Sequence, residues 1–395
     1  MIDMNLALVI ITKDRPQMVD RLIWSILQAK LHSYSIVLID DSSPANFSQI
    51  MKSLRSHSVR SIQLSSIQAR NYVEKDLDEA NLTQGERKFI EDCTGLRSPF
   101  DDFVGCLYGR KAESRSTRVG LRFAPYSPAR NLGIYCAVKF FNPDVIFFLD
   151  DDCLILQPGK LREQLQLIQQ KLKQRSIVAI AGNYKDLPGS EPKTASGKGV
   201  LEKSVGILRG MDAFLKQSLS VETARYKINP PHMLGGALIL SKRVFCNLPF
   251  DPYVARGEDH AYAWDLRAFL SEKEIAIRDH HFLIGHRREE PFPGREETNI
   301  LRDVFRFVYM RAKIGGSFIS LFIIRWALAS LIRCLFNPSK YAQCKRELWA
   351  LMLFAPRFAR ENASEFRRNL KAWTNFLNQS KLLLVTYSNL GQTRS

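Results

Sequence analysis

Uninterrupted hydrophobic runs recur along the chain, and each ends in polar or acidic residues. The clearest runs cover residues 6–11, 36–39, 145–149 and 177–182. Such runs are typical of strands that are covered on both faces of a sheet. Between the first two runs, apolar side chains recur at helical spacing from Val19 to Leu27, shortly after a proline suited to a first helical turn. A strand, a helix and a second strand in this order predict a right-handed parallel unit, and hence an α/β fold.

The last quarter of the chain differs from the rest in charge. The 395 residues carry a net charge of +17, and residues 301–395 hold 16 Lys and Arg against 4 Asp and Glu, which leaves +12 there. We expect one domain over residues 1–300, with a polar insertion at about 47–124, and a basic helical extension over residues 301–395. The extension has either a surface that binds lipid head groups or nucleic acid, or simply a solvated basic face.

The run 318–336 within this extension is apolar enough to raise the question of a membrane span. Arg325 near its centre and Arg333 near its end offset the favourable insertion free energy of the apolar side chains. A spanning helix is therefore not predicted. Two interpretations remain: an interfacial helix with its arginines on lipid phosphates, and a helix packed on the domain or on a second copy of the chain.

Cysteine usage and the N-terminus indicate a compartment. The seven cysteines are scattered, odd in number and without CxxC spacing, which favours reduced thiols over a disulfide framework. The N-terminus has no basic segment before its short apolar run, so no export signal is predicted. We expect a cytoplasmic protein, or one attached peripherally to the inner face of a membrane.

The candidate chemistry centres on three consecutive carboxylates, Asp150, Asp151 and Asp152, which directly follow the run 145–149. In an open α/β sheet, ligands bind at the carboxyl ends of the strands. Side chains alternate along a strand, so we expect Asp150 and Asp152 to share a face and Asp151 to point away. Two such carboxylates supply the hard oxygen ligands that suit Mg²⁺ or Mn²⁺. Taken alone, the motif is equally well explained as a solvated acidic turn.

Four segments resemble, in order, the nucleotide-sugar half of family 2 glycosyltransferases, which have the GT-A fold. They are LALVIITKDRPQMVDRLIWSIL, SIVLIDDSS, SPARNLGI and VIFFLDDDC. The resemblance implies a mixed sheet flanked by helices. It also implies that Thr12, Arg15 and Asp40 bind the base and ribose of the donor, and that Arg130 faces its diphosphate. The alternatives are a turn role for Asp40 and a salt bridge from Arg130 to one of the three aspartates.

Two later segments resemble the same family. Gly235 and Gly236 precede an apolar run and would let the backbone approach the donor sugar closely. Glu258 and Asp259 match a Glu-Asp motif at a helix start, where the residue equivalent to Asp259 is the general base in inverting members. A partly desolvated carboxylate near an anionic diphosphate has a raised pKa, which suits a base. The alternative is that both acids merely stabilise the N-terminus of the helix.

A metal site is implied by the same resemblance. Several GT-A enzymes use a histidine after the Glu-Asp helix as a ligand, and this chain has His280, His281 and His286 there. His286 fits the pattern best, and a structural hydrogen bond is the alternative for each histidine. The implied site for Mn²⁺ or Mg²⁺ is Asp150, Asp152 and His286, with Asp150 and Asp151 also contacting the nucleotide.

The sequence therefore predicts a metal-dependent glycosyltransferase of glycan or glycoconjugate synthesis, which uses a UDP- or GDP-sugar and an acceptor hydroxyl. If Asp259 is the general base, the transfer inverts the configuration of the anomeric carbon. If Asp259 only binds the acceptor, retention of configuration is possible. A sugar nucleotidyltransferase is a weaker alternative, because the loop TKDRP lacks the glycines it would need. A non-catalytic basic protein that binds a membrane or nucleic acid would explain the charge but not the ordered acids. We expect no nucleic-acid partner, and a homo-oligomer is compatible with the extension.

Overall fold

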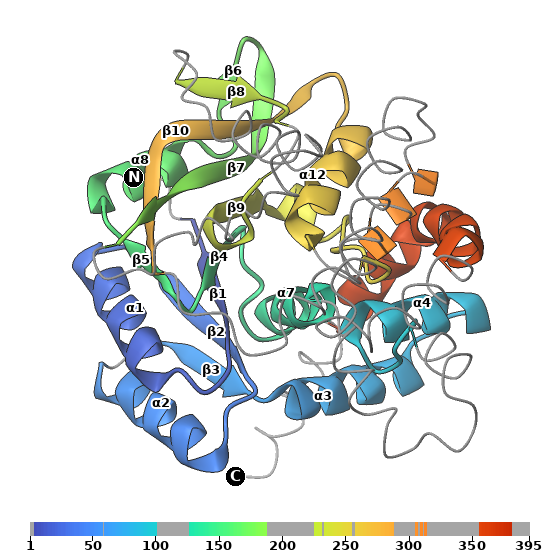
Figure 1. The fold of residues 1–395 in the computed structure, drawn as a ribbon, viewed down its shortest axis with the longest axis horizontal. Helices are drawn as coiled ribbons and strands as arrows, with labels where there is room; N and C mark the ends of the chain where they lie inside the picture. The colour runs from blue at the N-terminus through green and yellow to red at the C-terminus, as the bar shows by residue number, and fades with distance from the viewer. Residues whose placement is uncertain are drawn as a thin grey trace, which may run out of the picture.

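The computed structural model describes residues 4–57, 59–100, 126–187, 225–230, 233–254, 257–287, 305–306, 309–310, 312–313 and 355–380. Within these residues, ten strands form one sheet in the order β3-β2-β1-β4-β9-β7-β10-β5, with β6 beside β7 and β8 beside β10 (Figure 1). The strands are β1 (Leu6–Thr12), β2 (Tyr34–Asp40), β3 (Ser61–Leu64), β4 (Val145–Asp150), β5 (Cys153–Ile155), β6 (Lys171–Leu172), β7 (Arg175–Asp186), β8 (Tyr226–Ile228), β9 (Leu238–Ser241) and β10 (Glu274–His286).

Helices flank this sheet. They are α1 (Pro16–Gln28), α2 (Pro44–Ser56), α3 (Ser66–Glu79), α4 (Gln84–Thr94), α7 (Ser127–Phe141), α8 (Pro158–Leu167), α11 (Lys242–Phe245) and α12 (Glu258–Phe269), with a 3-10 turn, η1, at Gly235–Ala237. Strands β3, β2, β1 and β4 run parallel to one another, whereas β9 is antiparallel to both β4 and β7. The predicted α/β class, a mixed sheet flanked by helices, is confirmed.

The register of the parallel strands brings the predicted motifs to one edge. Thr12 at the end of β1 pairs with Asp40 at the end of β2, and Ile11 pairs with Asp150 at the end of β4. The carboxyl ends of β1, β2 and β4 therefore meet, which is where an open α/β sheet binds ligands.

Alternating side chains of the sheet build a core on each face. On one face, Leu8 and Ile10 of β1 pack in a cluster with α1, α2 and α8; on the other, Ala7 and Val9 pack with α3, α4 and α7. Helix α7 approaches β1 so closely that a Cβ at Gly133 would lie 2.3 Å from Cγ1 of Val9. The last residue of SPARNLG is thus a glycine because the strand leaves no room for a side chain.

Much of the segment 47–124, the expected insertion, packs into the sheet and its core. Residue 47 lies inside α2, and β3 pairs with β2 as a parallel strand of the main sheet. Helices α3 and α4 supply buried residues to the core of the domain. This segment is therefore integral to the domain at least as far as residue 100, and residues 101–125 lie outside the described residues.

The described parts of the C-terminal extension pack on the domain. The Trp373 indole N–H donates to the Phe245 carbonyl oxygen at 3.1 Å, and Phe376 stacks on Tyr135 with ring centroids 5.6 Å apart. Both aromatic side chains of the extension are fully buried. Buried side chains from both sides of residue 300 therefore share one hydrophobic cluster, and the boundary at 300 stays a prediction. The run 318–336 lies outside the described residues, and no helix that the structure describes is long and apolar enough to cross a membrane.

Candidate active site

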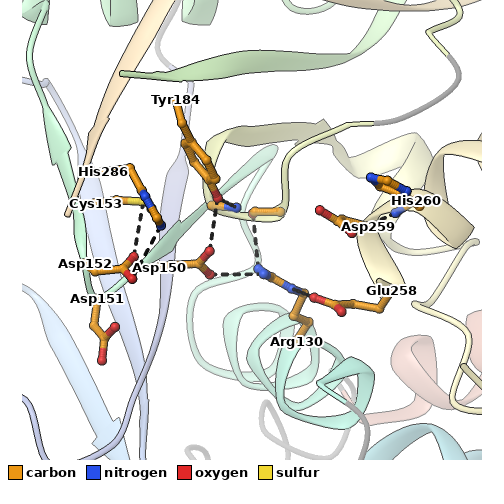
Figure 2. A network of polar contacts seen from close by, with 12 residues as sticks. Arg130, Asp150, Asp151, Asp152, Cys153, Tyr184, Glu258, Asp259, His260 and His286 are labelled. Carbon is orange, nitrogen blue, oxygen red and sulfur yellow. Dashed lines mark hydrogen bonds and ion pairs between the residues drawn. The ribbon is translucent and has the colours of Figure 1, made fainter. Parts of the chain in front are cut away.

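The acidic motif lies where β4 leaves the core. The strand is buried up to Leu149 and ends at Asp150, which is partly exposed. Asp151 and Asp152 form a turn before Cys153 begins β5. Donor atoms of Asp150 and Asp152 lie together, while Asp151 points toward the end of β1 (Figure 2). The predicted division of the three acids is thus found, although a turn causes it rather than alternation along a strand.

Asp151 is held by β1 and the loop that follows it. The Thr12 hydroxyl donates to Asp151 Oδ2 at 2.8 Å, and Arg15 Nη1 donates to Asp151 Oδ1 at 2.9 Å. Burial raises the pKa of the Asp151 carboxyl, and the Arg15 charge and these hydrogen bonds oppose the rise. Two residues predicted to bind the nucleoside, Thr12 and Arg15, therefore contact the acidic motif itself.

Arg130 connects three of the predicted motifs. Its Nη2 donates to Asp150 Oδ1 at 3.0 Å, its Nη1 to the Gly235 carbonyl at 3.1 Å, and its Nε to Glu258 Oε1 at 3.1 Å (Figure 2). The residue is 5% exposed. Burial lowers the pKa of the guanidinium, but Asp150 and Glu258 raise it by more, so the group stays charged. The alternative of a salt bridge to an aspartate is realised, and the second ion pair, to Glu258, was not predicted.

The glycine pair is required by these side chains. A Cβ at Gly235 would lie 2.4 Å from Arg130 Nη2, and one at Gly236 would lie 2.5 Å from Asp150 Oδ2. Because both distances are far below contact distance, any larger residue would displace the arginine or the aspartate. Close approach of the same backbone to a donor sugar stays a prediction.

Tyr184 completes the surroundings of Asp150, and sequence reasoning missed it. Its hydroxyl donates to Asp150 Oδ2 at 3.1 Å and accepts from the Gly236 N–H at 2.9 Å. Its ring stacks on His286 with centroids 4.6 Å apart and planes at 14°. The hydrophobic run predicts a strand only to residue 182, whereas β7 continues to Asp186. A tyrosine two residues beyond an apolar run was the available signal.

Of the three consecutive aspartates, Asp152 has the most distant positively charged partners. Its Oδ2 lies 3.5 Å from His286 Nε2 and 3.7 Å from Arg15 Nη1. Burial, followed by the charges of Asp150 and Asp151, raises the pKa of Asp152 to about 7. An acid in this condition gains from a cation that neutralises it.

The donor atoms fit a hard divalent cation. Asp150, Asp152 and Cys153 each offer an atom within 4.8 Å of the other two, in the described part of the chain. Burial raises the pKa of the Cys153 thiol well above its ordinary value, and sulfur is a soft ligand, whereas hard cations prefer oxygen. The two aspartates are therefore the suited ligands for Mn²⁺ or Mg²⁺. His286 is not in this group of three, but its Nε2 lies beside Asp152 Oδ2.

Asp259 is the second residue of α12 and directly follows Glu258 (Figure 2). It is partly exposed, and its Oδ1 accepts the His260 N–H at 2.9 Å. Burial raises its pKa, while Arg130 and then Arg306 lower it. Burial also raises the pKa of Glu258, against the opposing effect of Arg130. Of the pair, Asp259 is the more exposed residue.

Three further candidate residues, Asp40, His280 and His281, have contacts other than those expected for ligand binding. Asp40 is fully buried and accepts from the Ser42 N–H at 2.9 Å and from Gln63 Nε2 at 2.6 Å, so it has no surface for a nucleotide base. His280 Nδ1 lies 3.4 Å from Asn183 Nδ2, and the His281 N–H donates to Asp279. The interactions described for these two histidines are structural ones.

Comparisons with known proteins give weak likenesses. No family model and no curated protein matches the chain. Among solved structures, it is similar to TarS from S. aureus, with a TM-score of 0.41 and 11% identity over 91% of this chain and 55% of TarS, so it spans about half of that chain. It is also similar to mannosyl-3-phosphoglycerate synthase from Rubrobacter xylanophilus, with a TM-score of 0.38 and 12% identity over 79% and 75% of the two chains. At these values, function must be inferred from the site itself.

Proposed function

We propose that this protein is a metal-dependent glycosyltransferase that moves a sugar from a UDP- or GDP-sugar to an acceptor hydroxyl. The observation that carries the proposal is the set of contacts of Arg130, which binds the acidic motif, the glycine pair and the Glu-Asp motif at once. Arg130 and Glu258 are 128 positions apart in the sequence. A solvated acidic turn would not need a buried arginine that joins it to two distant segments.

Asp150 and Asp152 would hold Mn²⁺ or Mg²⁺, with His286 beside them. When bound, the cation would neutralise the negative charge that develops on the leaving nucleoside diphosphate. Arg130 and Tyr184 each bind one oxygen of Asp150, which fixes the orientation of this ligand. Because all three of its nitrogens are engaged, we assign Arg130 to positioning rather than to contact with the diphosphate.

Asp259 is the proposed general base. It would accept the proton of the acceptor hydroxyl as that oxygen bonds to the anomeric carbon and the diphosphate leaves, which inverts the configuration. The raised pKa of Asp259 suits a base that works near neutral pH. Glu258, neutralised by Arg130, holds the start of α12 against the acidic motif.

The donor site can be tested by thermal unfolding with a panel of nucleoside diphosphates and nucleotide sugars, with and without Mn²⁺. A ligand at about one hundred times its Kd stabilises a protein by about 2.7 kcal/mol. We expect a uridine or guanosine nucleotide to stabilise the wild type only with Mn²⁺, and Asp152→Asn to lose this effect. Asp78→Asn, an exposed carboxylate in an ion pair on the surface, is the matched control and should behave as wild type. No stabilisation by any nucleotide would sink the proposal in favour of a basic binding protein.

The base is tested separately by Mn²⁺-dependent hydrolysis of the donor, in which water replaces the unknown acceptor. Asp259→Asn should keep the nucleotide affinity of the wild type and lose turnover, by about a hundredfold or more. If Asp259→Asn instead weakens nucleotide binding and leaves turnover per bound donor unchanged, the base is another group.

A further inference from the structure

Residues 305–313 of the extension pack on the domain through one helical face. The residues described in this range are helical. Phe305, Tyr309 and Lys313 recur at a spacing of four residues, so they lie on the same side of a helix. All three are at most 5% exposed, and the Tyr309 hydroxyl donates to Asp251 of the domain at 2.8 Å. These buried contacts fix where the other side chains of the segment lie.

The same segment follows α12. Lys313 Nζ donates to Asp265 Oδ2, within that helix, at 2.6 Å. Earlier in the segment, Arg306 lies against Gly257, the residue that directly precedes α12, because a Cβ at Gly257 would collide with Arg306 Nη1. The first contact of the segment is therefore at the N-terminus of α12 and the later one is further along it. The extension thus holds the helix that begins with the Glu-Asp motif at two places.

Gly257 makes the approach of Arg306 possible. Its φ is +69°, in the left-handed region that favours glycine. The absence of a side chain leaves room for the guanidinium at the end of the helix. A cation is ordinarily unfavourable at a helix N-terminus, because the helix dipole is positive there. Nearby carboxylates must therefore compensate the charge of Arg306.

The two acids at the start of α12 differ in how they are paired. Glu258 Oε1 accepts from Arg130 Nε at 3.1 Å, and this pair is buried. Asp259 is partly exposed, and burial raises the pKa of its carboxyl. The charges of Arg130 and Arg306 both lower that pKa. Asp259 is thus the acid on which the extension acts.

Other ionisable groups also surround Asp259. They come from α7, β4, β7 and α12 itself, and they are Arg130, Asp150, Tyr184, Glu258 and His260. Asp150 raises the pKa of Asp259, and the His260 N–H lowers it through its hydrogen bond. Among the described groups, Arg306 is the charge that comes from the extension. Its removal should therefore change the ionisation of Asp259 without disturbing the contacts of Arg130.

We propose that Arg306 is a positioning residue for the general base, so that the extension completes the active site; this inference rests on the proposed function. The guanidinium stabilises the ionised Asp259 carboxylate, which is the form that accepts a proton from the acceptor hydroxyl. The buried face of Phe305, Tyr309 and Lys313 keeps the arginine at the start of α12. The extension is thereby assigned a part in the chemistry in addition to its packing on the domain.

The test is the pH dependence of kcat/KM for Mn²⁺-dependent hydrolysis of the UDP- or GDP-sugar. Below its pKa the general base is protonated and the rate falls. Without the arginine, Asp259 keeps its proton to higher pH, so Arg306→Gln should move this acidic limb upward by about one pH unit. Arg306→Lys retains the positive charge and should retain the limb of the wild type. The matched control is Arg367→Gln, which removes an arginine of the extension that donates to the Lys313 carbonyl at 2.9 Å, and it should leave the limb in place.

Gly257→Ala gives a second variant that keeps the arginine in the chain. Its methyl group would displace the Arg306 guanidinium, so the acidic limb should again move to higher pH. Alanine is also strained at the positive φ of this position, which lowers stability for a separate reason. The double variant Gly257→Ala, Arg306→Gln separates the two effects. If the glycine acts by making room for Arg306, the double variant has the limb of Arg306→Gln alone.

The outcomes separate this inference from the proposed function. If the wild type hydrolyses no UDP- or GDP-sugar, the proposed base fails and this inference fails with it. If the wild type hydrolyses the donor and Arg306→Gln keeps the same acidic limb, only the role of Arg306 is overturned, even where kcat falls. A loss of nucleotide affinity with an unmoved limb would assign Arg306 to the donor and also overturn the inference. Melting curves identify unfolded variants, and Arg306→Lys and Gly257→Ala carry the test if Arg306→Gln does not fold.

Discussion

Two clusters of buried carboxylates in this protein are compensated in opposite ways. Asp251 and Asp265 both bind the Lys313 ammonium, Asp265 at 2.6 Å, and Asp251 also accepts the Tyr309 hydroxyl at 2.8 Å. All three charged side chains are at most 5% exposed. In the acidic motif, by contrast, the Asp152 side chain is 18% exposed, and Arg15 Nη1 lies 3.7 Å from its Oδ2.

Burial is the largest cause of the raised pKa in both clusters, but the effect of the neighbouring charges differs. Burial raises the pKa of Asp265 to about 6, and Lys313 opposes the rise. Burial raises the pKa of Asp152 to about 7, and its neighbours Asp150 and Asp151 add to the rise. The first cluster has a cation supplied by the chain itself, Lys313, and joins the extension to the domain. The second leaves negative charge facing solvent, which is what a site for a cation requires.

The largest effect should come from removing the internal cation. Lys313→Met leaves two buried carboxylates facing each other, and breaking a buried pair costs about 3–5 kcal/mol. Urea denaturation should show this loss in the free energy of unfolding. The exposed Lys371→Met in the same extension is the control, with an expected change within about 0.5 kcal/mol. Equal effects of the two variants would show that Lys313 is not the neutralising charge.

Removal of a charge from the acidic motif should stabilise the protein, whereas removal of Lys313 destabilises it. Asp152 has a pKa of about 7 in the folded protein and an ordinary value of 3.8. Between these values the folded state holds a proton that the unfolded state has released, so the free energy of unfolding falls as the pH rises from about 4 to about 7. Asp152→Asn does not titrate. In EDTA it should therefore be more stable than wild type above pH 7, by on the order of 3 kcal/mol, with the gain vanishing toward pH 4.

Thermal unfolding of the wild type and Asp152→Asn from pH 4 to pH 8 in EDTA checks this pH dependence. Unfolding with Mn²⁺ gives a second test. At pH 8, Mn²⁺ should stabilise the wild type and leave Asp152→Asn unchanged, because the cation replaces the missing compensation. A variant that is less stable than wild type at every pH in EDTA would contradict the idea that Asp152 carries uncompensated charge.

Local pattern was sufficient for the strands that carry this site, because a buried strand must be apolar along its whole length. The runs 6–11 and 145–149 became β1 and β4, and Asp150 was correctly placed at a strand end. The start of α12 at Glu258 also agrees with the prediction. These features depend on neighbours in sequence, which is the information that hydrophobic periodicity contains.

The contacts that define the site could not be predicted in this way. The ion pair of Arg130 with Glu258 joins segments 128 positions apart, and that of Lys313 with Asp251 joins segments 62 apart. Nothing in the local pattern of Tyr184 indicates that its hydroxyl binds Asp150. Asp40 matched the motif of a family, yet the structure buries it and exposes Asp41 instead. Partners of buried polar groups are set by tertiary packing, so the sequence predicted Arg130 and Glu258 as site residues but not their pairing.

The smallest effect concerns Arg15, which lowers the pKa of Asp152 from 3.7 Å away. Arg15→Met should move the midpoint of the stability change assigned to Asp152 to higher pH, because the ionised carboxylate loses a favourable charge. The arginine side chain is 26% exposed, so the interaction is partly screened and the effect should be about 1 kcal/mol or less.

Arg15 also binds Asp151, so overall stability changes for a second reason. The informative quantity is therefore the midpoint, measured as the difference between backgrounds with Asp152 and with Asn at that position. Arg21→Met, on the exposed side of α1, should leave the midpoint in place. A shift to lower pH in Arg15→Met would mean that the charge felt by Asp152 comes from elsewhere, and the contrast between the two clusters would then need another explanation.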